Sequence, residues 1–463
     1  MDSSPYAMAG KGPAAVPSHD SGPRSPFRPN NHKRTATAAM AFLTTALFLL
    51  LFRPSLRPAP PPPPFAHLAA YCAHVPPPPP ASFVARQDTL AATLTALGAA
   101  AYVAEPGASA AFFANLSGDA WHLSERPLLL LVTPAQDAAP PAARLTVLTP
   151  AFEASRARLL PVPAGAEVLY PAWPEDADPY EVAVAALPGL RGGTLFVDGA
   201  MRQFVVDGLR RAAGPGATVV SAPPEVRRLR ERKSREEIEI LKCANEATLE
   251  AIRAARDEMY IGMRESEARG LVESALASTG LKHGGGLVLF GPNAALPHGS
   301  GTDRRLRKRD MVLVDVGASL HGYVSDVTRT FALEDSAIPM EHLDIWSLVW
   351  TAQTLAFAAA RNDTVAAHVD RTARRTIEAG GYGPYFTHRL GHGIGLEGHE
   401  APYLRGGSED IILTGHTFSD EPGVYIEGEV GVRLEDCFYV DDDGRPVFLT
   451  AGVGGQAGSA WEP

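Results

Sequence analysis

The feature that most constrains this chain is a pair of acidic residues placed symmetrically in a strand–turn–strand pattern. The stretch "VDVGASLHGYVSDVTRTF", residues 314–331, reads as two strands around a glycine-containing centre. Asp315 and Asp326 are equally distant from the point between Leu320 and His321, so a hairpin with that centre would place the two side chains opposite each other. Like charges in that position destabilise a sheet. The pattern therefore calls for a compensating cation.

A second stretch repeats the arrangement about 100 residues later. "FSDEPGVYI" and "VGVRLEDCFYV" predict another hairpin, in which Glu421 and Glu435 are equidistant from Gly428. Four acids that face one another in one domain would repel strongly with nothing between them. Two divalent cations would turn this repulsion into ligation.

Histidines occur close to the acids in the sequence. The segment "THRLGHGIGLEGHE", residues 387–400, contains His388, His392 and His399, and the loop "LPHGSG" contains His298. Four carboxylates with one imidazole form an oxygen-rich ligand set, which suits Mn²⁺ best, with Co²⁺ or Zn²⁺ as alternatives. Two such ions about 3.5–4 Å apart form a hydrolytic centre.

The domain pattern changes along the chain. Helical and strand-like segments alternate over residues 82–225, which predicts an α/β domain. A capping box at Ser234 and Glu237 opens a long helix in the second domain, residues 226–455. Its hairpins indicate antiparallel pairing and an α+β fold. Residues 456–463 are expected to form a C-terminal tail.

The N-terminal part has a different composition. Residues 1–34 read as a disordered basic tail, and residues 53–81 as a proline-rich linker. Between them, residues 35–52 carry no charge. A single transmembrane helix fits the length of the run better than a cleaved signal peptide or a buried helix does. The expectation is a single-pass membrane protein with a cytoplasmic N-terminus and a lumenal or extracellular catalytic domain.

Charge and cysteine content exclude some classes. The net charge is −10, which argues against a nucleic-acid partner. The three cysteines form no CxxC motif, so a thiolate zinc site is not expected. We expect them to be buried or free thiols, with Cys72 outside the globular part.

Taken together, the motifs "PHGS", "VDVGASLHGYVSDVTRTF", "HRLGHGIGLEGHE", "SDEPGVY" and "VRLEDC" resemble those of the pita-bread metallopeptidases. This family includes Xaa-Pro aminopeptidase, prolidase and methionine aminopeptidase. The resemblance covers residues 82–455, and the first domain is similar to the creatinase-type N-terminal domain. It therefore points to the Xaa-Pro aminopeptidase and prolidase branch. The implied fold is an α+β pita-bread catalytic domain preceded by an α/β creatinase-like domain.

The resemblance implies a metal-binding role for five residues. Asp315 would bind one ion, and Asp326 and Glu435 would bridge both. His392 and Glu421 would bind the second ion.

It also implies catalytic and substrate-binding roles. Glu421 would relay a proton from the nucleophilic water to the leaving nitrogen. His298 and His399 would bind substrate and stabilise the tetrahedral intermediate, and His388 would line the pocket for the proline ring. Arg433 would orient the bridging Glu435 or the carboxylate side of the substrate.

Some positions depart from the family pattern. Arg309 stands in place of a turn glycine, Gly398 in place of a valine, and His416 in place of a methionine. None of them is an expected ligand, so metal binding is expected to be intact and fine specificity is open.

The expected function is a dinuclear metal-dependent exopeptidase that hydrolyses the Xaa-Pro bond of peptides with proline at the second position. The sequence leaves open whether it is an aminopeptidase or a dipeptidase. A catalytically inactive pita-bread module that binds peptides or proteins is the alternative, and a metal-free relative of creatinase is a third class. All five ligand positions are occupied by suitable residues, which disfavours both. A homodimer is also expected.

Overall fold

The computed structural model describes residues 64–135 and 141–463. Its first sheet has six strands in the order β4-β3-β2-β1-β5-β6. The strands are β1 (Ala99–Ala104), β2 (Leu129–Pro134), β3 (Ala143–Pro150), β4 (Ala172–Trp173), β5 (Thr194–Val197) and β6 (Thr218–Ser221). Pairing of β5 with β1 and β6 is parallel, whereas β2 is antiparallel to β1 and β3.

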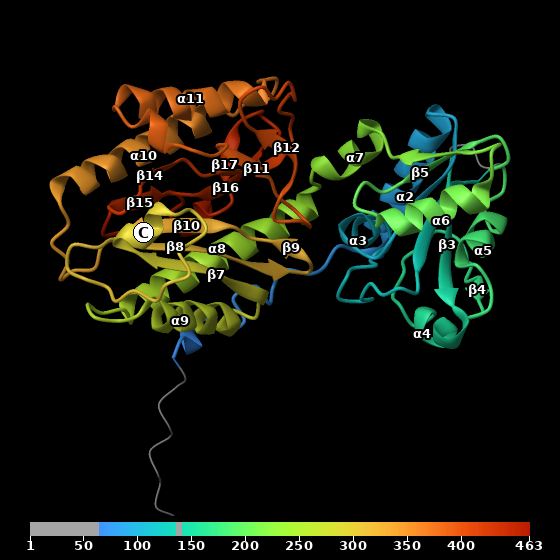
Figure 1. Cartoon of the computed structure of the whole chain (residues 1–463), viewed down its shortest axis with the longest axis horizontal. Coiled ribbons are helices and arrows are strands. Elements are labelled where there is room, and N and C mark those ends of the chain that lie inside the picture. The colour runs from blue at the N-terminus through green and yellow to red at the C-terminus, as the bar shows by residue number, and fades with distance from the viewer. Residues whose placement is uncertain (1–63, 136–140) are drawn as a thin grey trace, which may run out of the picture. The chain divides into compact units, whose positions relative to one another are not determined.

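Helices pack against this sheet (Figure 1). They are α2 (Pro80–Ala96), α3 (Ala108–Ala114), α4 (Ala154–Ala157), α5 (Pro179–Ala185), α6 (Gln203–Ala213) and α7 (Pro224–Glu231). Two apolar clusters fill the two faces of the sheet, because alternate residues of β1 such as Tyr102 and Val103 point into different clusters. The layered α/β arrangement agrees with the sequence prediction.

The second part of the chain contains antiparallel sheets and long helices (Figure 1). One sheet has the order β10-β8-β7, with β9 paired to β8, another has the order β12-β11-β13-β16-β17, and β14 pairs with β15. The strands of the first sheet are β7 (Lys282–Phe290), β8 (Val312–Leu320), β9 (Tyr323–Val324) and β10 (Val327–Phe331). The others are β11 (Gly391–Gly393), β12 (Glu400–Leu404), β13 (Thr417–Asp420), β14 (Gly423–Ile426), β15 (Val430–Arg433), β16 (Asp436–Val440) and β17 (Pro446–Phe448).

Four long helices accompany these sheets: α8 (Arg235–Asp257), α9 (Glu265–Ser278), α10 (Met340–Ala359) and α11 (Ala366–Ala379). The predicted capping box is present at the start of α8, where Ser234 accepts from the Glu237 amide and the Glu237 carboxylate accepts from the Ser234 amide. Short 3₁₀ helices include η1 (Ala66–Leu68), η3 (Gly291–Ala295), η4 (Gly383–Tyr385) and η5 (Ala451–Val453).

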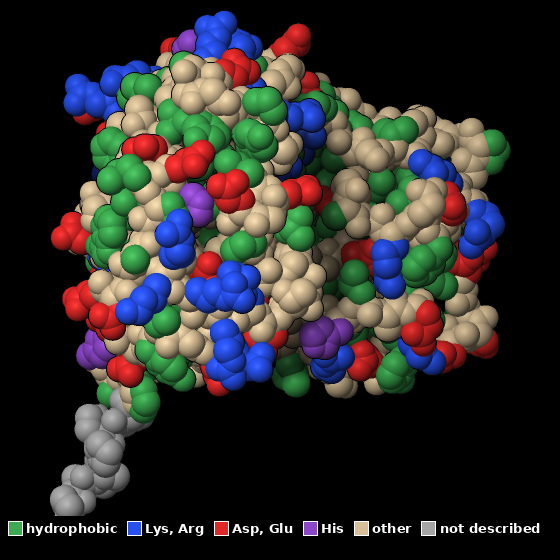
Figure 2. Space-filling model, turned by 60° about the vertical axis from the view of Figure 1, so that its left-hand side comes forward, with side chains coloured by type: hydrophobic (Ala, Val, Ile, Leu, Met, Phe, Trp, Pro, Cys, Tyr) green, Lys and Arg blue, Asp and Glu red, His purple; other side chains and the backbone are tan. Residues whose placement is uncertain are grey.

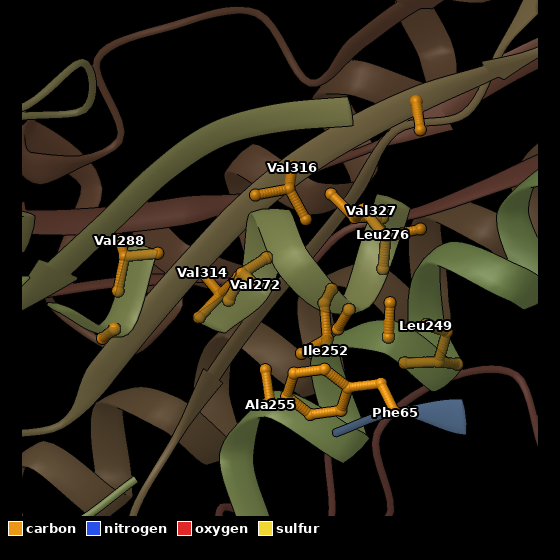
Figure 3. Close-up of a cluster of buried hydrophobic side chains, with 14 of the residues drawn as sticks. Phe65, Leu249, Ile252, Ala255, Val272, Leu276, Val288, Val314, Val316 and Val327 are labelled. Carbon is orange, nitrogen blue, oxygen red and sulfur yellow. The ribbon is translucent and has the colours of Figure 1, made fainter. Parts of the chain in front are cut away.

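The alternation of side chains along β8 explains how the sheet presents polar groups. Val312, Val314 and Val316 are buried in a cluster with α8 and α9, part of which Figure 3 shows. Asp315 lies between them in sequence and so projects from the opposite face. Burial of one face thereby fixes which residues the other face offers.

The first segment that the structure describes, which begins at residue 64, is packed rather than extended. Phe65, Leu68 and Cys72 are buried in the cluster of α8 and α9, and Figure 3 shows Phe65 beside Ile252 and Ala255. This corrects the expectation that residues 53–81 form a spacer, for the part that the structure describes. The proline-rich composition concealed a short apolar segment that packs against α8 and α9.

The cysteine prediction also needs correction. Cys72 forms a disulfide with Cys243 of α8, across a sequence separation of 171 residues. The two residues are brought together by tertiary packing, which their spacing in sequence does not reveal. Cys437 is a buried free thiol, as expected.

The C-terminal residues belong to the fold as well. Ala457 and Ala460 are buried, the Ala332 amide donates to the Ala460 carbonyl at 2.7 Å, and Arg253 donates to the Pro463 carbonyl at 2.8 Å. Residues 456–463 are therefore not a free tail. They cover one side of β10 and α8.

The predicted membrane topology is contradicted. Within residues 64–135 and 141–463, no helix combines the length and the apolar character that crossing a bilayer requires. The segment 35–52, on which the prediction of a single-pass protein rested, lies outside the described residues. On the face that Figure 2 shows, basic and acidic side chains are interspersed.

Candidate metal centre

The five expected ligands come from strands or strand ends of several sheets. Asp315 lies on β8 and Asp326 directly precedes β10, while His392 lies on β11. Glu421 follows β13, and Glu435 separates β15 from β16. The structure brings these positions, which span 121 residues of sequence, to one place.

The register of the first hairpin differs from the predicted one. Asp315 pairs with Thr328, and Leu320 pairs with Tyr323, so the turn consists of His321 and Gly322. Both turn residues have positive φ, 52° and 87°, which a tight two-residue hairpin turn requires. A non-glycine residue is uncommon in that conformation. The symmetry of the two aspartates had pointed to a centre one residue earlier.

The shift by one residue in the turn moves the pairing by two residues. It therefore preserves the face on which both aspartates lie, because side chains alternate with period two. Asp315 and Asp326 are diagonal neighbours on one face rather than direct opposites. The inference that they converge is unaffected.

The register of the second hairpin agrees with the prediction. Gly423 pairs with Arg433 and Val424 with Val432, so the hairpin is centred on Gly428 as expected. The predicted long strands are each interrupted, however. One break falls at Glu421 and the other at Leu434, and the next residue, Glu435, pairs with Thr328 instead.

The ligand atoms form three overlapping groups, within each of which they lie no more than 4.8 Å apart. The groups are Asp315, Asp326 and Glu435; His392, Glu421 and Glu435; and Asp326, His392 and His399. Glu435 belongs to two groups that otherwise share no member, and Asp326 also belongs to two. This is the arrangement expected of residues that bridge two ions.

The hydrogen bond of His392 fixes its tautomer. Nδ1 lies 3.0 Å from the Gly393 carbonyl oxygen, which can only accept, so Nδ1 carries the proton. Nε2 lies 3.2 Å from Glu421 Oε1 and 3.8 Å from Asp326 Oδ2. This nitrogen therefore lies on the side of the carboxylates, where it could bind the same cation as they do. Orientation by a carbonyl is typical of metal-binding imidazoles.

The pKa values of the carboxylates also indicate that the cluster suits a bound cation. Burial raises the pKa of Asp326 well above its usual value, and the nearby charges of Asp315 and Glu421 raise it further. Burial likewise raises the pKa of Glu435, with Asp326 as the next cause. Burial and the neighbouring charges therefore oppose ionisation of Asp326 and Glu435, which a bound cation would favour. The donor set fits divalent cations that prefer oxygen ligands.

Hydroxyl groups hold two of the carboxylates. Thr328 donates to Glu435 Oε2 at 2.6 Å and pairs with Asp315 across the sheet. Ser419 donates to Glu421 Oε1 at 3.1 Å and accepts from the His392 amide at 3.1 Å. Thr328 and Ser419 were missed from the sequence, although Thr328 shares a face with Asp326, two residues before it.

Arg433 opens a directed chain of hydrogen bonds at the edge of the cluster. Its guanidinium forms an ion pair with Asp315 and donates to the Tyr425 hydroxyl at 2.9 Å. His388 Nδ1 lies 2.6 Å from the Arg389 carbonyl, so Nδ1 carries the proton and Nε2 accepts from Tyr425 at 2.8 Å. His388 thus lies beside the metal cluster rather than in it.

Tyr425 is a second residue that the sequence analysis missed. Burial raises its pKa to about 12, so it remains a neutral donor to His388. The signal was present, because Tyr425 lies four residues after Glu421 and opposite Gly431 in the register of the hairpin.

The other two predicted site histidines, His399 and His298, lie at the surface of the candidate metal centre. His399 is exposed, and its ring lies against that of His392 with centroids 4.0 Å apart. His298 is exposed in a turn closed by the Gly299 amide and the Leu296 carbonyl at 2.8 Å. The Pro297 carbonyl, one residue earlier, accepts from Arg433 at 3.5 Å.

Comparison with known proteins defines the class. Residues 239–442 match Metallopeptidase family M24. An uncharacterized peptidase of Schizosaccharomyces pombe is 38% identical over 356 residues, which cover 76% of this chain and 77% of the relative. The protein therefore belongs to metallopeptidase family M24.

Two further proteins that are similar to this chain are named as dipeptidases. The Xaa-Pro dipeptidase of Pyrococcus furiosus is 37% identical over 222 residues, covering 47% of this chain and 63% of the relative. The crystal structure of dipeptidase PepE from Mycobacterium ulcerans has a TM-score of 0.71 at 29% identity, covering 81% of this chain and 97% of that one. The pita-bread fold with an additional N-terminal domain is thus shared with solved peptidases, and the chain is a metallopeptidase.

Proposed function

We propose that the protein hydrolyses the Xaa-Pro bond at the N-terminus of peptides as a dinuclear metal-dependent exopeptidase. The observation that carries this proposal is the overlap of the groups of candidate ligand atoms, in which Glu435 joins Asp315 and Asp326 to His392 and Glu421. Relatives named as Xaa-Pro dipeptidase and dipeptidase support the substrate class.

Five residues are proposed to hold the ions: Asp315, Asp326, His392, Glu421 and Glu435. Manganese is the proposed physiological metal, because the ligand set is dominated by carboxylate oxygens. When bound, two divalent ions supply Lewis acidity and a nucleophile at neutral pH.

Side chains in and around this set of ligands are proposed to transfer protons, to stabilise the transition state and to bind the substrate. Glu421 is proposed to accept a proton from the attacking water and to transfer it to the leaving proline nitrogen as the peptide C–N bond breaks. His298 and His399 are proposed to donate to the negative charge that develops on the carbonyl oxygen. Arg433, through Tyr425, holds the ring of His388 at the proposed proline pocket.

The test uses purified full-length chain that has been stripped with a chelator and supplied again with Mn²⁺. Ala-Pro and Ala-Pro-Ala are the substrates, and release of alanine is measured. We expect turnover that depends on metal. Cleavage of both peptides indicates an aminopeptidase, and cleavage of Ala-Pro alone indicates a dipeptidase. Absence of turnover on both contradicts the proposal and favours a binding module.

Substitution of a bridging residue tests the assignment of ligands. Asp326→Asn and Glu435→Gln should each lower kcat/KM by at least about 10³-fold, because each removes a negative ligand shared by two ions. Glu105→Gln is the matched control. Glu105 is a buried glutamate directly after β1 that accepts from the Arg202 amide and guanidinium, away from the cluster. Near-normal turnover of Glu435→Gln would contradict the bridging role.

A further inference from the structure

The loop before β12, residues 395–399, carries His399. Among the described residues, no hydrogen bond reaches the His399 ring, which rests on the ring of His392. At one end, the Gly395 carbonyl accepts from the Val324 amide at 2.8 Å. The position of His399 must therefore depend on how the other end of the loop is held.

Glu400 holds that other end by a buried ion pair. It directly follows His399, and its Oε1 lies 2.5 Å from Lys233 Nζ. The side chains of Lys233 and Glu400 are 1% and 3% exposed. An ion pair so fully desolvated is sensitive to the loss of either partner, since the charge left behind has no compensation.

The ammonium group of Lys233 is saturated with acceptors. Besides Glu400, it donates to the Arg230 carbonyl at 3.1 Å and the Glu231 carbonyl at 3.0 Å. An ammonium group has three donors, so each has a partner. The Lys233 amide also donates to the Gly415 carbonyl at 2.7 Å, which fixes the backbone of this residue.

Arg230, at the end of α7, binds the same loop a second time. It forms an ion pair with Glu397 and lies 3.8 Å from Glu400. Gly395 completes the packing, because a Cβ there would lie 2.7 Å from Glu400 Oε1 and 2.7 Å from Lys233 Cε. The segment between α7 and α8 and the His399 loop are thus in close contact.

We propose that Lys233 and Glu400, with Arg230, are positioning residues that hold His399 over the metal centre for the proposed peptide hydrolysis. Their charges act through the loop and not on the substrate. This inference rests on the proposed function only for its kinetic consequence. The anchoring of the loop itself is measurable without turnover.

The kinetic test separates positioning from folding. Lys233→Met should lower kcat on Ala-Pro about 10- to 100-fold and leave KM within about two-fold, because a donor needed in the transition state is misplaced. In a His399→Ala background the same substitution should cause no further loss, since its effect passes through His399. An equal loss in both backgrounds overturns the proposal.

Matched variants guard against a simple loss of stability. Arg202→Met breaks the Arg202–Glu105 ion pair in the first sheet, where the carboxylate is also buried, and should leave kcat unchanged. Lys233→Met/Glu400→Gln removes both charges and avoids an uncompensated carboxylate if the single variant does not fold. It should show the same dependence on His399.

Hydrogen exchange supplies the readout that is independent of activity. In metal-free protein, amides of residues 395–400 should exchange faster in Lys233→Met than in wild type, and at the wild-type rate in Arg202→Met. Unchanged exchange of that loop overturns the proposal even if the wild-type enzyme proves inactive on Xaa-Pro peptides. Conversely, faster exchange with an inactive wild type leaves the anchor intact and refutes only the proposed function.

Discussion

His416 is a buried residue whose protonation the fold opposes. Burial, followed by the positive charges of Lys233 and Arg232, lowers its pKa to about 3. Its Nδ1 accepts from the Leu413 amide at 3.2 Å, which requires an unprotonated nitrogen. An unfolded chain would protonate this histidine near pH 6.5.

The pH dependence of stability follows from this difference. Between pH 6.5 and about 3 the unfolded chain binds a proton that the folded chain does not, so the free energy of unfolding falls as the pH falls. The slope from this residue approaches about 1.4 kcal/mol per pH unit and vanishes above pH 6.5.

His416→Met provides the test, because it removes the titrating group and keeps a buried side chain of similar size. Denaturant unfolding of both proteins at pH 7 and pH 4.5 should show the variant gaining stability relative to wild type at the lower pH. An equal difference at the two pH values would contradict the buried neutral state.

The convergence of the proposed ligands was predictable, and their supporting residues only in part. The acids and His392 stand out because mirrored carboxylates have no role in an ordinary sheet. Thr328 and Tyr425 share strand faces with Asp326 and Glu421, so period-two alternation could have found them. Ser419 was harder to predict, since its contacts depend on which strand lies beside β11.

At the scale of elements, the contact between β15 and η3 leaves no room for a side chain. A Cβ at Gly431 would lie 1.8 Å from the Ala294 carbonyl oxygen. Gly431→Ala should therefore displace η3 and with it the turn that carries His298. We expect a loss of about 1–3 kcal/mol in the free energy of unfolding and a lower kcat/KM.

Gly270→Ala is the control for that substitution. It lies within α9, where a Cβ would meet no heavy atom within 4 Å, and alanine favours a helix over glycine by about 0.5–1 kcal/mol. This variant should be slightly more stable and fully active. A Gly431→Ala protein as stable and active as wild type would show that η3 adapts freely.

Element types were predicted better than their limits. The second hairpin has its predicted centre at Gly428, because a glycine marked the turn. The first turn contains His321 at positive φ, and a sequence pattern gives little warning of a non-glycine residue there. The interruptions at Glu421 and Leu434 were not predicted, and Glu435 pairs with Thr328 of another sheet, which a local pattern does not reveal.

At the scale of the whole molecule, the Cys72–Cys243 disulfide encloses the entire first sheet in one covalent loop. Cross-linking over 171 residues should stabilise the fold by about 2–5 kcal/mol by restricting the unfolded chain. The variant with both cysteines replaced by serine should unfold at lower denaturant concentration and lose the response to dithiothreitol. If wild type is equally insensitive to dithiothreitol and has three free thiols, the disulfide is refuted.

The pattern of helical and strand-like segments predicted the global organisation only as far as one α/β region followed by one α+β region. Composition could not show that Phe65 and Leu68 pack on α8, because their flanking prolines dominate the local pattern. It also could not show that Ala460 pairs with Ala332. Both contacts join segments far apart in sequence, so local periodicity carries no trace of them.

Metal stoichiometry tests the central claim most directly. The full-length protein is saturated with Mn²⁺ and dialysed, and bound metal is measured by elemental analysis for wild type, Glu435→Gln and the control Glu105→Gln. Gathering of carboxylates around divalent ions predicts two ions per chain in wild type and control, and a clear loss in Glu435→Gln. Wild-type protein that retains no Mn²⁺, Co²⁺ or Zn²⁺ in stoichiometric amount would contradict the account.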